Sequence, residues 1–401
     1  MARKMKDSGI EWIGEIPEGW ETQKLKYYAT VTSGEILSRD EYDFSGDIPV
    51  IGSNGKIGTT YKSNNHSEVI TTGRVGTIGT AQIVQDAWIT DNALIIKSHS
   101  INRPFLAYVI PNFDFKFMLS GTAQPLITAT KLKNQHIPVP SSEVQDKLVQ
   151  YLNTQIFNLS HLISQACSSI ELYKKLKQAV ITQAVTKGVR GEREMKDSGV
   201  EWIGKVPSKW NCIKIKYLFE IRKRIAGKEG YTVLSITQTG IKPKNISSNE
   251  GQLADSYSNY QLLHFGEFAM NHMDLLTGWV DISNYNGVTS PDYRVFSLKD
   301  TITNHPRYFL YLMQMCYFNR IFYSMAQGVS NLGRWRLQSD KFLNCIFPVP
   351  SIEEQKEISD YLDTTCSEID KLIAKKEQLV KELESYKKSL IYEVVTGKRK
   401  V

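Results

Sequence analysis

Long apolar runs are missing from this chain of 401 residues, and none approaches the roughly 18 residues that a membrane-spanning helix needs. The N-terminal stretch MARKMKDSGIEW has no apolar segment behind its basic residues, so it lacks the form of a signal peptide. The five cysteines are scattered and include no CxxC pair, which argues against a disulfide framework and a zinc ribbon. We therefore expect a cytoplasmic protein without a membrane partner.

The usual catalytic signatures are also missing. GSNGKIG at 52–58 has Ile57 where a P-loop needs Ser or Thr, and GRVGTIG at 73–79 lacks the G-x-G-x-x-G spacing of dinucleotide sites. NHPRY at 304–308 only faintly resembles the Asn/Asp-Pro-Pro-Tyr motif of amino-methyltransferases, because the second proline is absent. No pair among the seven histidines has metal-ligand spacing. We expect a non-enzymatic chain with no catalytic residue, metal or cofactor of its own.

The chain does contain an internal repeat. MKDSGIEWIGEIPEGW begins at Met5 and MKDSGVEWIGKVPSKW at Met195, and over 24 positions the two copies share 14 residues. Farther on, IPVPSSEVQDKLVQYLNT from Ile137 matches FPVPSIEEQKEISDYLDT from Phe347. The blocks between these repeated segments differ, which indicates a tandem duplication. It predicts recognition domains at 1–140 and 191–350, and helical regions at 141–190 and 351–401.

Each P-V-P segment predicts the start of a long helix. The residue before Pro140 or Pro350 is biased away from helix, and Ser142-x-x-Gln145 and Ser351-x-x-Glu354 fit capping boxes. Apolar residues then recur with heptad spacing, which is typical of a coiled coil. Gly188 and Gly397 stand where C-caps are expected. The predicted coiled-coil seam consists of Leu148, Leu152, Leu159, Leu162, Leu176, Ile358, Leu362, Ile369, Leu372, Leu379, Leu383 and Leu390.

These helices could pair with each other or pack separately on their own blocks. We favour pairing, because the two seams match in length and phase, and an antiparallel pair, because the second block must return the chain. Both blocks contain β-branched runs broken by glycines, as in EVITTGRVGTIGTAQIV, which predicts strands and hairpins. The expected fold class is α+β: two mixed β-rich domains separated by two long helices in an antiparallel coiled coil, with pseudo-twofold symmetry.

Charge gives a weaker signal of function. The net charge is +7, and it is unevenly distributed, since residues 1–140 hold 14 basic and 14 acidic residues whereas residues 191–350 hold 19 and 14. Arg, Lys, Asn and Gln in polar loops are suited to base edges and phosphates. The candidate DNA contacts are Arg74, Thr77, Gln124, Lys131, Asn331, Arg334, Arg336 and Lys341.

Together, the doubled entrance, the doubled P-V-P hinge, the heptad helices and the RVGTIG loop resemble the specificity subunits (HsdS) of Type I restriction-modification systems, over nearly the whole chain. This resemblance implies two target recognition domains that each read half of a bipartite, asymmetric site in double-stranded DNA. It also implies that the coiled coil sets the spacer and docks two methyltransferase subunits (HsdM), with restriction subunits (HsdR) joining them.

The same resemblance implies adenine methylation by the partner, with S-adenosylmethionine, ATP and Mg on partner subunits. One alternative is a non-enzymatic coiled-coil scaffold for protein interactions, and another is a fused restriction-modification enzyme, which would need the methylase motifs found absent. For the repeated Trp-Ile and Pro-x-x-Trp residues of the entrance, we favour packing anchors over direct DNA contacts.

Overall fold

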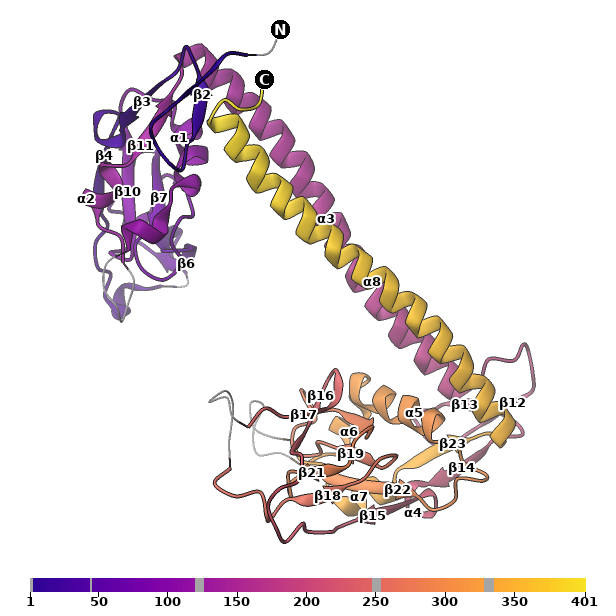
Figure 1. Ribbon diagram of the computed structural model, residues 1–401. Helices are drawn as coiled ribbons and strands as arrows, with labels where there is room; N and C mark the ends of the chain where they lie inside the picture. The colour runs from indigo at the N-terminus through magenta and orange to yellow at the C-terminus, as the bar shows by residue number, and fades with distance from the viewer. Residues whose placement is uncertain (1–2, 44, 120–125, 247–253, 328–334) are drawn as a thin grey trace. The chain divides into compact units, whose positions relative to one another are not determined.

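The computed structural model describes residues 3–43, 45–119, 126–246, 254–327 and 335–401. The chain divides into two compact units: residues 1–167 with 377–401, and residues 168–376. Each unit contains one β-rich body and parts of two long helices, α3 (Ser142–Lys187) and α8 (Ile352–Val395) (Figure 1). None of the helices in the described ranges is long and apolar enough to cross a membrane.

The body of the first unit is built on a four-stranded antiparallel sheet in the order β4-β10-β7-β8 and a three-stranded sheet in the order β6-β5-β9. Its elements are β1 (Met5–Asp7), β2 (Glu15–Pro17), β3 (Glu21–Lys24), η1 (Leu25–Tyr27), β4 (Ala29–Ser33), η2 (Arg39–Glu41), β5 (Ile48–Gly52), β6 (Gly55–Thr60), β7 (Val69–Gly73), β8 (Gln82–Val84), β9 (Trp88–Ile89), β10 (Ala93–Ser98), α1 (Arg103–Val109), η3 (Ile110–Asn112), η4 (Phe115–Met118), α2 (Ala129–Lys133) and β11 (His136–Val139).

The second unit repeats this plan with a four-stranded sheet in the order β15-β22-β19-β20. Its elements are β12 (Met195–Asp197), β13 (Lys205–Pro207), β14 (Asn211–Lys214), α4 (Ile215–Leu218), β15 (Phe219–Arg222), β16 (Leu234–Thr237), β17 (Gly240–Pro243), β18 (Gln261–Leu263), β19 (Phe268–Met270), β20 (Val280–Ile282), β21 (Gly287–Thr289), β22 (Arg294–Leu298), α5 (Pro306–Phe318), α6 (Ile321–Ser324), α7 (Ser339–Asn344) and β23 (Ile346–Val349).

The repeated segments form the same structure in both units. Each entrance is a hairpin, β1-β2 or β12-β13, and each P-V-P segment is a strand that pairs with the strand after the entrance, β11 with β3 and β23 with β14. Trp20 and Trp210 are buried, 3% and 1% exposed, in the cores of their units. The expected tandem duplication and mixed α and β content are therefore confirmed.

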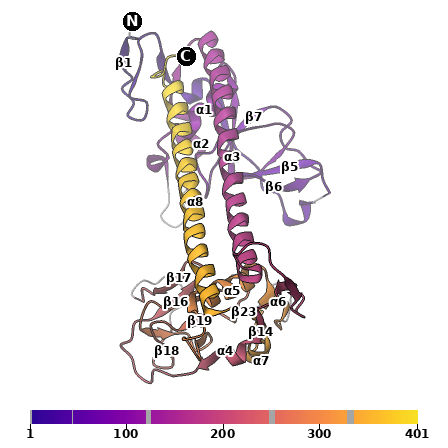
Figure 2. The ribbon, with the colours of Figure 1, turned by 90° about the vertical axis from the view of Figure 1, so that its right-hand side faces the viewer.

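Within each unit, α3 and α8 run side by side in opposite directions. Figure 2 shows the start of α3 beside the end of α8 in the first unit, where the two helices share a core through Leu152 and Leu390. In the second unit the end of α3 shares a core with the start of α8, through Ile181 and Ile358. The expectation of antiparallel helix pairing is confirmed in each unit. The predicted C-cap glycines are also confirmed, since Gly188 and Gly397, just beyond the ends of α3 and α8, have φ of +78° and +73°.

The predicted helix starts differ in detail from capping boxes. The Ser351 hydroxyl accepts a hydrogen bond from the Glu354 amide at 3.4 Å, as a cap should. However, the Glu354 carboxylate binds Trp210 and Arg193 of the entrance instead of turning back to the start of the helix. Gln145 likewise extends away from Ser142 and binds the Pro140 carbonyl, so these side chains connect the helices to the bodies.

Candidate DNA-recognition loops and the frame that holds them

One buried glutamine in each unit connects the body to the long helix. Gln145, 4% exposed, accepts a hydrogen bond from the Asn102 amide at 2.8 Å and donates one to the Pro140 carbonyl at 2.8 Å. Gln355, 0% exposed, accepts from the His305 amide at 2.7 Å and donates to the Pro350 carbonyl at 3.0 Å. Each amide thus fixes the helix of the body, α1 or α5, to the hinge.

In both units, a tyrosine at the equivalent position forms a second hydrogen bond between the body and the long helix. The Tyr108 hydroxyl donates to Asn153 Oδ1 at 2.6 Å, and the Tyr311 hydroxyl donates to Asp363 Oδ1 at 2.6 Å. In the second unit Arg307 also binds Asp363 through Nε at 2.8 Å. The Arg307 and Tyr311 hydrogen bonds lower the pKa of Asp363 although burial opposes this shift. Both bodies are therefore held by equivalent contacts.

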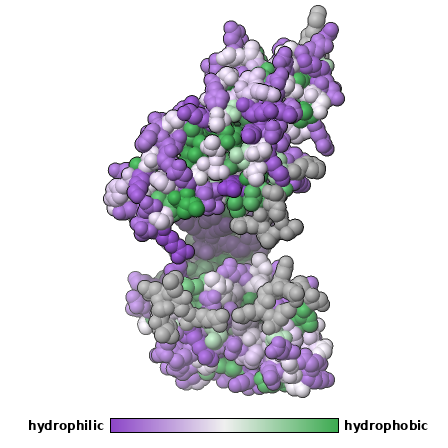
Figure 3. All heavy atoms as spheres, turned by 90° about the vertical axis from the view of Figure 1, so that its left-hand side faces the viewer, coloured by the Kyte–Doolittle hydropathy of each residue, from purple (hydrophilic) through white to green (hydrophobic). Residues whose placement is uncertain are grey.

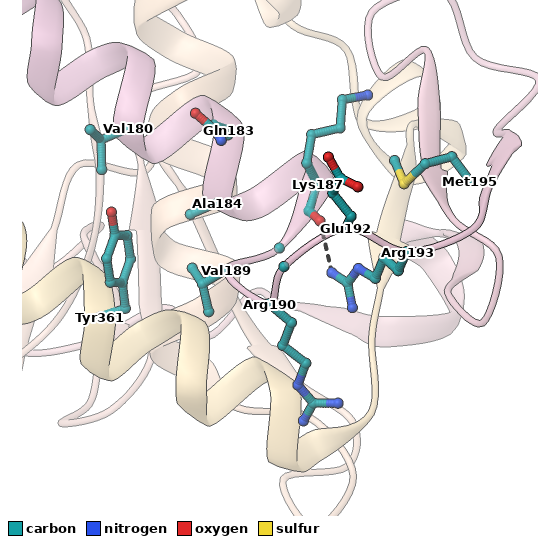
Figure 4. A pocket seen from close by; sticks show the side chains of 12 residues that line it. Val180, Gln183, Ala184, Lys187, Val189, Arg190, Glu192, Arg193, Met195 and Tyr361 are labelled. Carbon is teal, nitrogen blue, oxygen red and sulfur yellow. Dashed lines mark hydrogen bonds between the residues drawn. The ribbon is translucent and has the colours of Figure 1, made fainter.

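In the second unit a further ion pair connects the end of α3 and the start of α8 to the entrance segment. Figure 4 shows Arg193 pointing toward the end of α3, where Nη2 donates to the Lys187 carbonyl at 2.7 Å. Its Nη1 lies 2.5 Å from Glu354 Oε1, and the guanidinium lies over the Trp210 ring at 5.4 Å. The Trp210 indole N–H donates to Glu354 Oε2 at 3.0 Å. The entrance tryptophan is thus a packing anchor, as we favoured from the sequence.

The first candidate loop follows β7 and contains Arg74 and Thr77. Arg74 is half-buried, its amide donates to the Asn92 carbonyl at 2.8 Å, and its Nη1 donates to the Asp91 carbonyl at 3.3 Å. Its carbonyl accepts from the Ile127 amide at 2.9 Å, which connects this loop to the segment before α2. Thr77 is exposed. Arg74 therefore holds the loop as well as presenting a positive charge.

The equivalent of Arg74 in the second unit is His272, which sequence reasoning missed. Ile70 pairs with Ile96 in the first sheet and Phe268 with Phe296 in the second, and four residues after each stand Arg74 and His272. The His272 carbonyl accepts from the Leu337 amide at 3.0 Å, as that of Arg74 does from Ile127. The two loops therefore share one backbone anchor and carry different side chains.

A buried arginine that has no carboxylate partner among the described residues lies near the second loop. Arg294, 3% exposed, donates to the Leu337 carbonyl at 2.9 Å and stacks over Phe342 at 4.6 Å. Burial lowers the pKa of Arg294 to about 10. Burial, with Arg294 and Arg336 nearby, also lowers the pKa of His272 to about 3, so the imidazole is neutral near pH 7. No sequence signal distinguished Arg294 from an ordinary solvated arginine.

The other predicted contacts lie near these loops or outside the described residues. Arg336 is exposed and pairs through its backbone with Gln327, two hydrogen bonds of 3.2 Å. Lys341 is exposed on α7, and Lys131 on α2 donates to the Leu119 carbonyl at 3.3 Å. Gln124, Asn331 and Arg334 lie outside the described residues. The visible face of each unit carries small apolar groups separated by hydrophilic side chains (Figure 3).

The predicted seam residues differ in their exposure. Seven are buried and Leu383 is partly buried, whereas four are exposed by more than a third. Buried are Leu148, Leu152, Leu159, Ile358, Leu362, Ile369 and Leu390; exposed are Leu162, Leu176, Leu372 and Leu379. Six of the seven buried members belong to the cores that the helices share with the β-rich bodies, and Ile369 does not. A seam role for the four exposed leucines stays a prediction.

The described residues give little support for a metal site or a reactive thiol. They contain no group of three or more His, Cys, Asp or Glu side chains placed to hold a metal ion. All five cysteines are free, and burial raises the pKa of the Cys316 and Cys345 thiols. The arrangement is one of anchored polar loops on a repeated frame, which suits recognition of an extended ligand.

Comparisons with known proteins agree with this arrangement. A specificity subunit of the MjaVIII Type I restriction enzyme from Methanocaldococcus jannaschii is 23% identical over 78% of this chain and 71% of its own length. A putative MjaX specificity subunit from the same organism is 26% identical over 51% of this chain and 53% of its own length.

Solved structures are more distant in sequence. A chain from a structural study of complex assembly and conformational transition in the type I restriction-modification system is 13% identical, covers 95% of this chain and 98% of that chain, and gives a TM-score of 0.67. This likeness shows the fold alone. The HsdS subunit from Thermoanaerobacter tengcongensis is 13% identical over 96% of this chain and 98% of that chain, with a TM-score of 0.49.

The family model for the Type I restriction modification DNA specificity domain matches twice, at residues 17–171 and 207–382. The two matches fall on the two repeated halves of the chain, and each runs from the end of the entrance hairpin through the sheet and the hinge strand into the long helix. The resemblance inferred from the sequence is thereby confirmed: the chain belongs to the family of Type I restriction-modification DNA specificity proteins.

Proposed function

We propose that this chain directs a Type I restriction-modification complex to a bipartite, asymmetric DNA site, with one half-site read by each unit. The observation that carries the proposal is the contrast at Arg74 and His272. The two residues share one backbone anchor on one repeated frame, yet one side chain is cationic and the other is neutral. A repeated frame with unlike loops is what two unlike half-sites require.

In this proposal residues 1–140 and 191–350 are the recognition domains, and residues 141–190 and 351–401 are the helical regions. The helices α3 and α8, of 46 and 44 residues, fix the spacer between the half-sites. Helices of this size extend about 66–69 Å at 1.5 Å per residue, which exceeds one turn of DNA at roughly 34 Å. A single insertion would then change the preferred spacer and leave both half-sites unchanged.

The duplicated frame also offers equivalent surfaces for two copies of one partner. We assign these surfaces to two methyltransferase subunits, through which restriction subunits join the complex. The partner would methylate adenine with S-adenosylmethionine, and ATP and Mg would belong to partner subunits. The chain itself supplies recognition and no catalytic group.

A binding titration tests this function. The chain assembled with its methyltransferase partner is titrated against duplexes that carry the bipartite site, the same site with one half scrambled, and a fully scrambled sequence. Affinity should be highest for the intact site, and all affinities should fall steeply with salt. Equal affinity for the three duplexes would contradict sequence-specific recognition.

Substitutions in the loops separate the half-sites. Arg74→Ala should relax recognition of the first half-site only, and Arg336→Ala should relax the second only, each by about 1–3 kcal/mol if the side chain reads a base edge. Thermal unfolding of both variants is the control. A large loss of stability with Arg74→Ala would show that Arg74 stabilises the loop through its hydrogen bond to the Asp91 carbonyl and does not read DNA.

A further inference from the structure

A lysine–tyrosine motif occurs at the same place in both units. Lys24-Leu25-Lys26-Tyr27 begins at the last residue of β3, and Lys214-Ile215-Lys216-Tyr217 begins at the last residue of β14. Leu25 and Ile215 are both 0% exposed, whereas Tyr27 and Tyr217 are 62% and 66% exposed. Each motif therefore consists of a buried aliphatic anchor flanked by lysines and followed by an exposed aromatic ring.

The two motifs are held in the same way. The Leu25 amide donates to the Gln135 carbonyl at 2.8 Å, and the Ile215 amide donates to the Cys345 carbonyl at 2.9 Å. These acceptors immediately precede β11 and β23, so both motifs are fixed to the hinge strands. The motif geometry is thus part of the rigid frame and is independent of the variable loops.

The side chains also adopt the same arrangement. The Nζ of Lys26 lies 5.1 Å from the centroid of the Tyr27 ring, and the Nζ of Lys216 lies 5.1 Å from that of Tyr217. Neither lysine forms an ion pair with a carboxylate in the described ranges. The ammonium groups therefore keep donors free for an outside acceptor, while the rings restrict the motion of the lysine stems.

Repetition of an exposed residue needs a cause, either a contact within the fold or a ligand that both copies meet. Elsewhere in the entrance, Asp7 recurs as Asp197 because each carboxylate accepts the amide of the following turn glycine at 2.9 Å. Lys6 recurs as well, but the exposed Glu11 recurs with it, so the hairpin gains no positive charge. Within the described ranges the exposed Tyr27 contacts Lys26 of its own motif and has no comparable hydrogen bond to the hairpin, which indicates that both motifs meet the same ligand.

Each motif carries two lysines and no acidic residue. Lys24 and Lys26 stand together in the first unit, and Lys214 and Lys216 in the second. In the second unit Lys299 adds a third cation, since its Nζ donates to the Lys216 carbonyl at 2.8 Å. A positive surface with an exposed ring suits a polyanion, and duplex DNA is the polyanion that the proposed function brings to both units.

We propose that Lys26 with Tyr27, and Lys216 with Tyr217, are two equivalent binding sites for the phosphodiester backbone of DNA, one beside each half-site. Phosphate contacts carry no sequence information, so identical residues can serve two unlike half-sites. This inference rests on the proposed function. In it, the frame provides binding affinity and positions the protein on the duplex, and the loops read the base sequence.

The distance between motif and loop is compatible with one DNA segment. Strand β4 begins two residues after Tyr27, and Ser33 at its other end pairs with Leu94, beside the β7 end that carries Arg74. Five strand residues extend about 17 Å. This is roughly half a turn of DNA, so a base-reading loop and a backbone contact can lie within one half-site and its flank.

The test measures DNA affinity and its salt dependence in the complex with the methyltransferase partner. The variants are Lys26→Ala with Tyr27→Ala, Lys216→Ala with Tyr217→Ala, and all four together, with Lys26→Gln and Lys216→Gln as milder forms that keep the rings. The matched control is Lys147→Ala, an exposed lysine on α3 whose counterpart 210 residues later is Glu357. Thermal unfolding of each variant shows that the frame is intact.

We expect each double substitution to weaken binding about 5- to 20-fold for specific and scrambled duplexes alike, with an unchanged ratio between them. The slope of log affinity against log salt should fall by about 0.9 for each phosphate that the variant no longer neutralises. Unchanged affinity and slope would overturn the proposal. Weaker binding to the methyltransferase in the absence of DNA would also overturn it, because it would assign the motif to a protein interface. A wild-type complex without sequence preference would contradict the proposed function alone, since the salt slope still tests the motif.

Discussion

Lys177 and Asp370 form an ion pair between α3 and α8 in the second unit, with Nζ 2.7 Å from Oδ2. The equivalent pair in the first unit, 210 residues apart in each case, is Lys387 with Ser160, whose Oγ accepts from Nζ at 3.0 Å. The helices therefore meet in one antiparallel register in both units, with the roles of α3 and α8 exchanged. The first unit has the lysine and lacks the carboxylate.

Introducing this carboxylate should stabilise the first unit. Ser160→Asp would place an acceptor opposite Lys387 and recreate the ion pair of the second unit. Exposed pairs contribute little, so we expect a gain of about 0.2–1 kcal/mol at low salt that decreases as salt rises. Chemical denaturation with and without added salt measures it. Ser160→Asn is the uncharged control, and an equal gain from it would contradict the ion-pair explanation.

The loop after β7 depends on the absence of a side chain at Gly73. A Cβ there would lie 1.8 Å from the Thr77 carbonyl oxygen and 2.7 Å from the Ser53 carbonyl oxygen, and both are backbone atoms. Gly73→Ala should therefore displace the loop and abolish discrimination in the first half-site, with the second half-site read as before. Binding to duplexes altered in one half at a time measures this. Gly19→Ala, which meets nothing within 4 Å, should leave both halves unaffected.

The ion pair of Glu354 with Arg193 is the buried connection between α8 and the second entrance. Glu354→Gln keeps an acceptor for Trp210 and leaves the Arg193 guanidinium without its counter-charge, so we expect a loss of about 3 kcal/mol in the free energy of unfolding. Glu357→Gln is the matched control, because its partner Arg190 is about half exposed. The loss of stability with Glu357→Gln should be much smaller, because water and salt screen an exposed pair. Equal losses in the free energy of unfolding for the two variants would show that burial of an ion pair does not increase its contribution to stability.

His272 should make the second unit sensitive to acid. Its pKa is lowered from 6.5 to about 3 in the folded chain, so below pH 6.5 the unfolded chain binds a proton that the folded chain does not. Stability is therefore complete above pH 6.5 and falls as the pH falls toward 3. Between pH 7 and pH 5 the loss should be about 2 kcal/mol. Denaturation of the wild type and His272→Gln at both pH values isolates this contribution, and an identical pH dependence of the two proteins would refute it.

Repetition and periodicity made the frame predictable from sequence. The heptad positions Leu148 and Leu152 identify a helix and its buried face, because that signal is local. The same pattern could not show that Leu162 and Leu372 stay exposed, since burial depends on what packs against a helix. The capping-box prediction included Gln145 and did not include Gln355, although both glutamines contact residues over forty positions away.

The site was less predictable than the frame. Arg74 stood out because it lies in a glycine-rich loop, but its equivalent His272 was hidden by loops of different length and composition. Only the sheet registers and the shared carbonyl hydrogen bonds reveal that these two positions correspond. Arg294 was equally hidden, because its burial depends on Phe342 and Leu337, which are distant in sequence.

The measurement that tests the central claim most directly is a map of methylated adenines in DNA exposed to this chain and its methyltransferase partner. The account predicts one asymmetric motif in two parts separated by a spacer of fixed length. Exchange of residues 191–350 for those of another specificity protein should change one part and leave the other part and the spacer unchanged. A continuous motif, or a change in both parts after the exchange, would contradict recognition of one half-site by each unit.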